Sequence, residues 1–540
     1  MNSSRWLLLF FLLLDIFVLL FGDIAYGTKD DVRILQLLSG TMLCSEPTAF
    51  IMYPNILVGV FLKSLYLLWP NVPWYFLFLS TFLIIAHLVS IAVVSRHKGV
   101  PFAAVTGIAF YLFFYQITFT ATSILIAFAG YSILFDAGLR NGKGFFGRLM
   151  PYLIAALMFL AAVSIRPETF FFASVFGSFS LLIALGIRRF LKEMAPFLVI
   201  VFLFSASLPA FDIMQYDSSG GNSEFAKYNK YKTFIVDFDV GEHSENFDEA
   251  LAKVGWSPND YELFHAWLFL KNEVFSLQNL KNFVEFLEIS YDSKTPDLIV
   301  FYERLMRDPY VIVVFVLFSL CLLLYGKSAA KRALTMFLFV NLVFVGVTLT
   351  MKMPPPRLYL PVFYFILVLI LLYTDDREAA RFRWTPYLLL SVSAGFFFVF
   401  AQIAKQNDIR RTTHLKYVQQ LEKERFYLSV DDALMPTGVD PRSDLAYLKG
   451  FKVVPFGTVV ILGEVERFMH ENGFDDYDAL FESENVRLLF PRKSLWKIEL
   501  LRNYLLEHYS VRVEAEVRKG TNDLYIVGFI PLEKAFGTES

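Results

Sequence analysis

Long apolar stretches separated by short polar segments run through most of the chain. The stretches are roughly 17–22 residues long, which is the length that an α-helix needs to cross the hydrocarbon core of a bilayer. The pattern therefore predicts about eleven membrane-spanning helices. The expected spans are 6–22, 74–95, 101–115, 119–135, 150–165, 169–185, 196–211, 309–325, 334–350, 358–373 and 387–403.

The segment after the first span, 23–73, contains a further apolar stretch at 51–69, which is interrupted by Lys63. Three basic clusters follow it, at 96–98, 140–148 and 188–192. If 51–69 crossed the membrane, all three clusters would lie opposite the N-terminus, against the tendency of Lys and Arg to remain in the cytoplasm. We therefore expect 51–69 to be a juxtamembrane helix along the interface. The N-terminus and the basic clusters are then cytoplasmic.

The first span contains a carboxylate, Asp15. Its apolar run is long and no small-x-small cleavage site follows, so we interpret it as an uncleaved anchor rather than a signal peptide. A carboxylate inside a membrane is costly and usually faces the interior of the bundle. Asp15 is therefore expected to be structural or to line a cavity.

Two larger polar parts face the exterior in this topology, a long loop at 212–308 and the C-terminal part at 404–540. The C-terminal part predicts a small α/β domain. Its expected strands are 458–462, 486–490, 511–516 and 524–529, with helices at 464–472 and 494–508. We interpret 1–403 as the transmembrane domain. The C-terminal domain shows no site motif, which favours a lid, a partner-docking module or an acceptor-binding module.

Composition supports a location in the plasma membrane. Hydrophobic residues make up 56% of the chain and charged residues 19%, whereas soluble proteins have about 45–50% and about 25%. The formal net charge is −2, so the chain lacks the overall excess of positive charge that is typical of nucleic-acid-binding proteins. The cysteines, Cys44 and Cys321, lie in a loop and in a span, so neither a disulfide nor a metal-binding spacing is predicted.

Adjacent carboxylates, Asp30 and Asp31, stand at the exterior interface just after the first span. Asp30 could cap a helix that begins near Val32, because an N-cap carboxylate accepts backbone N–H bonds. A cap explains one carboxylate and not two. An interfacial carboxylate can also act as a general base toward a hydroxyl or hold a metal ion. Asp30 and Asp31 are therefore the candidate catalytic residues.

Exterior cations lie in short turns close to the bilayer. Arg166 lies between two spans, and Lys352 and Arg357 flank a Met-Pro-Pro-Pro run that proline makes rigid. Each could contact a lipid headgroup or, for Arg166, pair with Glu168. Together, opposite a carboxylate pair, they fit a lipid-linked phosphate, since the guanidinium group matches phosphate geometry. Arg166, Lys352 and Arg357 are the candidate phosphate-binding residues.

This arrangement resembles the GT-C superfamily of integral membrane glycosyltransferases, and lipid-A aminoarabinose transferases and protein mannosyltransferases within it. The resemblance rests on Asp30-Asp31-Val-Arg, on Tyr53-Pro-Asn before the juxtamembrane helix, and on Lys352 and Arg357. It departs from the oligosaccharyltransferase branch, because no Trp-Trp-Asp-Tyr-Gly-type signature is present. Tyr53-Pro-Asn also replaces the Lys-Pro-Pro-like run of the aminoarabinose transferases.

The resemblance implies an inverting transferase that uses a polyprenyl-phosphate or polyprenyl-diphosphate sugar and a glycan or lipid acceptor of the envelope. It implies that Asp30 or Asp31 is the base or a metal ligand, and that Arg166, Lys352 and Arg357 bind the donor phosphate. No cofactor is assigned, and a divalent cation, Mg²⁺ or Mn²⁺, is left open. Membrane lipids are the remaining expected partners.

Other functions are left open. A polysaccharide polymerase or ligase would place essential Arg or His residues in a large exterior loop, and the 212–308 loop has His243 and His265 but no cationic cluster. A lipid-linked glycan transporter or flippase would show a two-fold internal repeat and charged residues near the middle of its spans. The sequence shows no such repeat, and apart from Asp15 its spans are nearly free of charge. A non-catalytic scaffold that presents the C-terminal domain is the third alternative.

Overall fold

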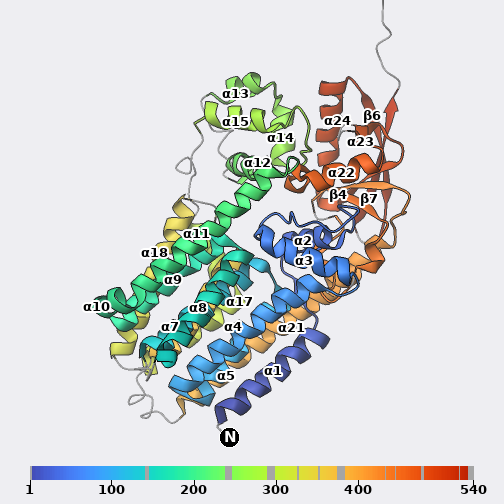
Figure 1. The fold of residues 1–540 in the computed structure, drawn as a ribbon. Coiled ribbons are helices and arrows are strands. Elements are labelled where there is room, and N and C mark those ends of the chain that lie inside the picture. Colours follow the sequence, from blue (N-terminus) through green and yellow to red (C-terminus); the bar gives the residue numbers. More distant parts are fainter. Residues whose placement is uncertain are drawn as a thin grey trace, which may run out of the picture.

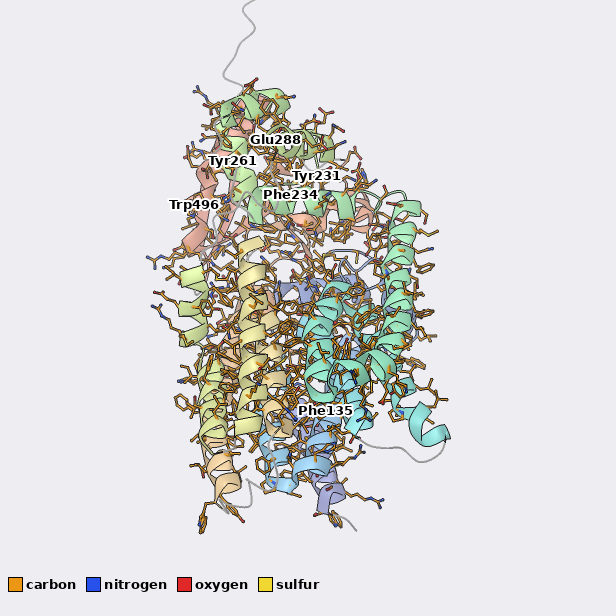
Figure 2. All side chains as sticks on the ribbon, turned by 90° about the vertical axis from the view of Figure 1, so that its left-hand side faces the viewer. Phe135, Tyr231, Phe234, Tyr261, Glu288 and Trp496 are labelled. Carbon is orange, nitrogen blue, oxygen red and sulfur yellow. The ribbon has the colours of Figure 1, made fainter. Side chains whose placement is uncertain are left out.

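A computed structural model describes most of the chain. It describes residues 3–139, 145–237, 246–288, 298–324, 327–350, 353–373, 384–431, 433–443, 445–475, 479–521 and 523–532. A bundle of long helices carries two smaller parts at one end, and the chain begins near the other end (Figure 1). Figure 2 shows the same division, with Phe135 toward the end where the chain begins and with Tyr261 and Trp496 in the two smaller parts.

Each expected span is helical. The bundle helices are α1 (Ser3–Phe21), α4 (Trp74–Lys98), α5 (Val100–Phe110), α6 (Leu112–Tyr115), α7 (Phe119–Leu139), α8 (Phe145–Ile165), α9 (Pro167–Leu185), α11 (Ala195–Ser218), α17 (Pro309–Leu324), α18 (Lys327–Thr350), α19 (Pro356–Tyr373) and α21 (Thr385–Val418). Within the described residues, 8 helices are long and apolar enough to cross a membrane, or 9 with a bent pair. The shorter apolar helices Val100–Tyr115 and Leu149–Ile165 occupy two further expected spans. The prediction of a polytopic helical membrane protein is confirmed.

Helices α7 and α19 form the centre of the bundle, with 83% of the most apolar part of each buried. Helix α7 packs against α4, α8, α9 and α19. The contact with α9 is close because Gly177 has no side chain. A Cβ atom there would lie 2.2 Å from the Tyr131 ring, well inside van der Waals contact.

The first loop, the long loop and the C-terminal part lie together at one end of the bundle (Figure 1). The first loop contains α2 (Lys29–Ser39) and α3 (Ile56–Leu68). The expected juxtamembrane stretch is α3, which exposes Leu57, Phe61 and Leu68. The long loop contains α12 (Phe225–Lys232), α13 (Phe247–Val254), α14 (Pro258–His265), α15 (Leu277–Phe286) and α16 (Leu298–Arg307).

A five-stranded sheet forms the C-terminal part, in the order β4-β3-β5-β7-β6. The strands are β3 (Phe426–Ser429), β4 (Lys452–Pro455), β5 (Val486–Pro491), β6 (Arg512–Lys519) and β7 (Leu524–Leu532), and the helices are α22 (Gly463–Glu471), α23 (Ala479–Glu482) and α24 (Lys497–Tyr509). Strands β3, β4 and β5 are parallel, whereas β7 is antiparallel to β5 and β6. The small α/β fold is confirmed.

The strand expected at 458–462 is wrong, because Thr458–Ile461 forms a 3₁₀ turn after β4. The chain turns at Gly457, whose φ of +101° is available to glycine at little steric cost. Thr458–Ile461 is fully buried, and a short buried apolar run does not distinguish a strand from a helical turn. Helix α21 continues past residue 403 to Val418, so the last span extends directly beneath the sheet.

Asp15 joins α1 to the bundle. Its carboxylate oxygens lie 2.9 and 3.0 Å from His87 Nδ1 of α4, and Tyr111 donates to it at 2.8 Å. His87 Nε2 lies 3.1 Å from the Gly107 carbonyl oxygen. Both Asp15 and His87 are fully buried. The carboxylate is therefore satisfied by its neighbours and has a structural role.

Replacement of Asp15 by Ala is expected to destabilise the protein by about 3–5 kcal/mol, because it leaves His87 buried without its partner. Thermal unfolding of the purified protein in detergent measures the effect. Leu13→Ala on the same helix is the control, since Leu13 is 59% exposed toward the lipid side. Equal melting temperatures for Asp15→Ala and the unmutated protein would contradict this role.

Candidate functional site

Asp31 is a buried anchor at the start of α2. Thr28 is the N-cap of the helix and accepts from the Asp31 backbone N–H. The Asp31 carboxylate accepts hydrogen bonds from Thr28 Oγ1 at 2.5 Å, Tyr75 Oη at 3.0 Å and the Phe119 backbone N–H at 2.9 Å. It is fully buried. Asp31 therefore joins the first loop to α4 and α7.

Burial raises the pKa of Asp31 to about 7, although the hydrogen bonds from Thr28, Phe119 and Tyr75 act in the opposite direction. In the unfolded chain an aspartic acid has a pKa of about 4. Its contribution to stability is therefore complete below about pH 4 and is lost as the pH rises through about 7. The protonated form is the one that the fold favours.

We expect Asp31→Asn to flatten the dependence of stability on pH, because the amide resembles the protonated acid and does not titrate. The melting temperature of the unmutated protein should fall more between pH 5 and pH 8 than that of the variant. Glu46→Gln, at an exposed carboxylate of the same loop, serves as the control and should keep the original pH dependence. An unchanged pH dependence in the Asp31→Asn variant would show that the raised pKa of Asp31 is not its cause.

Asp30 differs from its neighbour. It is half-buried, and it has no hydrogen bond or ion pair with any residue that the structure describes. The cap of α2 is Thr28, so the capping role that the sequence left open for Asp30 is not realised. The charge of Asp30 raises the pKa of Tyr53 and contributes to the raised pKa of Asp31. Asp30 is therefore an accessible carboxylate close to Tyr53.

Arg166 lies at the N-cap of α9, over two aromatic rings. Its guanidinium carbon is 5.1 Å from the centre of the Tyr53 ring and 5.0 Å from that of Phe119. Nη1 donates to Thr120 Oγ1 at 2.6 Å. Nε lies 3.7 Å from Glu168 Oε2 and, among the described residues, is buried without a hydrogen-bond acceptor. A donor of this kind is available to an anionic ligand.

Several charged side chains affect Tyr53. Its pKa is raised to about 12, mainly by burial and also by Asp30, while Arg166, Arg33 and Arg357 act in the opposite direction. Four charged side chains therefore act on one tyrosine. Arg33 was not among the residues predicted from the sequence, although it lies three residues after Asp30 and hence on the same face of α2.

A cavity of about 200 Å³ opens beside this cluster. Its lining comes from the first loop, the α6–α7 connection, the start of α19 and the extension of α21. The lining residues are Gly27, Thr28, Leu112, Phe113, Gln116, Thr118, Ala121, Pro355, Pro356, Arg357, Leu360 and Arg410. Arg357 and Arg410 form no ion pair with another described residue. Arg357 both lines the cavity and acts on Tyr53, so it connects the two.

Hydrogen bonds hold the walls of this cavity in place. Asn407 of α21 donates to the carbonyls of Asp23 and Tyr115 at 2.8 and 2.9 Å. Arg411 donates to the Asp23 carboxylate at 2.9 Å. Strands β1 (Ala25–Tyr26) and β2 (Gln116–Ile117) pair in parallel. These contacts bring Arg410 to the first loop, although the two are far apart in the sequence.

Not every expected residue is placed. Lys352 and His243 lie outside the described residues, so of the cations expected to bind phosphate the structure places Arg166 and Arg357. Arg410 was missed because it follows the last span and was assigned to the C-terminal domain. Its approach to the first loop depends on the direct continuation of α21, which no local pattern at Arg410 indicates.

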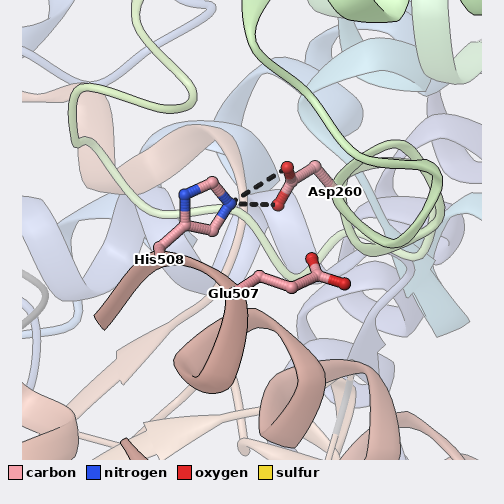
Figure 3. A group of neighbouring side chains, drawn as sticks. All are labelled: Asp260, Glu507 and His508. Atoms are coloured by element: carbon pink, nitrogen blue, oxygen red, sulfur yellow. Dashed lines mark hydrogen bonds and ion pairs between the residues drawn. The ribbon is translucent and has the colours of Figure 1, made fainter. Parts of the chain in front are cut away.

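Within the part of the chain that the structure describes, one group of three side chains has the spacing of a metal site, and it lies outside the first loop. Among the described residues, the group that could hold a metal ion is Asp260, Glu507 and His508. His508 Nε2 lies 2.9 and 3.0 Å from the Asp260 carboxylate oxygens (Figure 3). Ser257 donates to Glu507 at 2.7 Å and its backbone N–H donates to Asp260 at 2.8 Å. The group therefore connects α14 to α24 through its own hydrogen bonds.

Comparisons with known proteins find similar solved structures. No protein-family model and no curated protein matches the chain. Two crystal structures of ArnT from Cupriavidus metallidurans, one bound to undecaprenyl phosphate and one in the apo state, are similar to it, with TM-scores of 0.35 and 0.36. Each is 12% identical, and the match covers 97% of this chain and 98% of the other. Similarity at this level does not assign a function.

Proposed function

We propose that this protein is a membrane glycosyltransferase of the GT-C type, which takes a sugar from a polyprenyl-phosphate donor at the membrane end where the first loop lies. The acceptor is a hydroxyl of an envelope glycan or lipid. The observation that supports the proposal is that the half-buried carboxylate Asp30 and the arginines Arg33, Arg166 and Arg357 all act on Tyr53, while Thr28 of the same loop and Arg357 line one cavity.

In the proposed reaction, the carboxylate acts on the acceptor and the arginines act on the leaving phosphate. Asp30 takes the proton from the acceptor hydroxyl, whose oxygen forms a bond to the anomeric carbon as the bond from that carbon to the phosphate oxygen breaks. The polyprenyl phosphate leaves with the bonding electron pair. Arg357 and Arg410 stabilise its negative charge. A single displacement of this kind inverts the anomeric centre.

The remaining residues position these groups. Asp31 is assigned an anchoring role rather than that of the base, because three donors occupy its buried carboxylate. Arg166 rests on Tyr53 and Phe119, and its buried Nε is left for a phosphate oxygen. Because arginines supply the positive charge in this mechanism, we expect transfer to persist after EDTA removes divalent cations.

Asp30→Asn should lower the rate of sugar transfer about 10²–10⁴-fold, which is the usual contribution of a general base. The assay incubates purified protein with polyprenyl-phosphate sugars and envelope extracts and follows the release of polyprenyl phosphate. Glu46→Gln, an exposed carboxylate of the same loop, is the matched control and should keep full activity. Undiminished transfer by Asp30→Asn would exclude it as the base.

Arg357→Ala should weaken binding of a polyprenyl phosphate about 10–100-fold, as expected for the loss of a hydrogen bond to a charged group worth about 1.5–3 kcal/mol. Titration of the protein in detergent with the lipid phosphate measures the Kd. Arg467→Ala is the control, because this side chain is 65% exposed on α22. A Kd unchanged by Arg357→Ala would place the donor phosphate elsewhere.

A further inference from the structure

A second and larger cavity lies between the extension of α21 and the C-terminal sheet domain. We call it the outer groove, and its volume is about 1000 Å³. Three segments of the chain form its walls: α21, the stretch after β3, and the ends of β5 and β7. The lining residues are Arg410, Thr413, Tyr417, Ala433, Met435, Thr437, Pro491, Arg492, Lys493 and Asp523.

Arg410 joins the outer groove to the smaller cavity, because it lines both. The wall opposite it is held close by Gly438, where a Cβ atom would lie 2.3 Å from the Arg410 carbonyl oxygen. Glycine therefore lets the 3₁₀ turn Pro436–Gly438 rest directly on the backbone of α21. The two cavities therefore share Arg410, one of the arginines proposed to bind the donor phosphate.

The outer groove is positively charged. Its described lining holds Arg410, Arg492 and Lys493 against one carboxylate, Asp523. Arg492 Nη1 lies 3.8 Å from an Asp523 carboxylate oxygen, and both side chains are largely exposed. An exposed ion pair of this kind contributes little to stability. Arg410 and Lys493 form no ion pair with any described residue. The excess of positive charge favours an anionic ligand.

Two residues of the groove wall have a left-handed backbone conformation. Met435 has a φ of +48° and Asp523 a φ of +66°, in the left-handed region that residues other than glycine rarely adopt. Such conformations persist only where the surrounding structure imposes them, and they cluster at binding and catalytic sites. The Gly438 N–H donates to the Met435 carbonyl at 2.8 Å, which holds Met435 in place with its side chain 38% exposed.

We propose that the outer groove binds the acceptor and that the acceptor is an anionic glycan, one that carries carboxylate or phosphate groups. Lys493 and Arg492 bind its charged groups, and Thr413 and Thr437 are available to sugar hydroxyls. The reacting hydroxyl then passes Arg410 to reach Asp30. This assignment rests on the proposed function, which it extends by naming the acceptor class and its site.

The volume and position of the outer groove favour a glycan over the lipid donor. A cavity of about 1000 Å³ is at the upper end of the range for small-ligand sites and accommodates several sugar units. Its lining comes from the C-terminal domain and from the part of α21 that follows the expected span 387–403. A polyprenyl chain would leave the membrane to enter it, whereas a hydrated glycan would not.

Binding of acidic and neutral oligosaccharides tests the proposal without depending on activity. The full-length protein in detergent is titrated with oligogalacturonate, with a phosphorylated mannose oligosaccharide and with a neutral dextran oligosaccharide. We expect at least one acidic probe to bind, more weakly at higher salt, and the neutral probe to bind at least tenfold more weakly. The double variant Arg492→Gln/Lys493→Gln should raise the Kd of the acidic probe at least tenfold.

A matched pair of exposed cations provides the control. Arg518→Gln/Lys519→Gln removes the same charge from two adjacent exposed residues of β6 that do not line the groove, and should leave the Kd unchanged. An equal loss in both double variants, equal binding of neutral and acidic probes, or no binding of any probe would overturn the proposal. Sugar transfer is measured in parallel. Binding that depends on Arg492 and Lys493 without transfer by the unmutated protein would refute the proposed reaction and not the glycan site.

Discussion

The arrangement of the exterior face depends on one buried carboxylate. Asp31 accepts hydrogen bonds from the first loop, from α4 and from the start of α7, so three segments are fixed around a single group that is shielded from water. Ionisation of such a group is costly, which is why burial raises its pKa. Its neighbour Asp30 is only half-buried and acts on Tyr53 together with three arginines.

The last span has a comparable role on the other side of the site. Helix α21 leaves the membrane without a break and donates through Asn407 and Arg411 to the first loop. The same helix presents Arg410 to both cavities. A continuous helix is stiff over this distance, so the sheet domain that rests on it is held in a defined position relative to Asp30. In the proposed reaction, Arg410 therefore contacts both the smaller cavity, which takes the donor phosphate, and the outer groove, which takes the acceptor.

Polar contacts join the long loop to the sheet domain. Asp260 and His508 pair between α14 and α24 (Figure 3), and Lys271 pairs with Glu466 at 2.7 Å. Gly221 and Gly463 bring the two backbones so close that a Cβ on Gly463 would lie 2.8 Å from Gly221 Cα. The long loop and the sheet domain therefore form one cover over this end of the bundle rather than separate modules.

The amino-acid sequence by itself determined the class of fold, because helix-length apolar runs must cross or lie on a bilayer. The distribution of Lys and Arg predicted that 51–69 lies along the interface, and the structure gives a helix of 13 residues there. The sequence also proposed Asp30, Arg166 and Arg357 as site residues, because charge beside the membrane is unusual. Tertiary structure alone separated Asp30 from Asp31, since burial and hydrogen-bond donors come from α4 and α7. It alone added Arg410, which approaches the first loop only through packing of segments distant in the chain, and such contacts leave no local pattern.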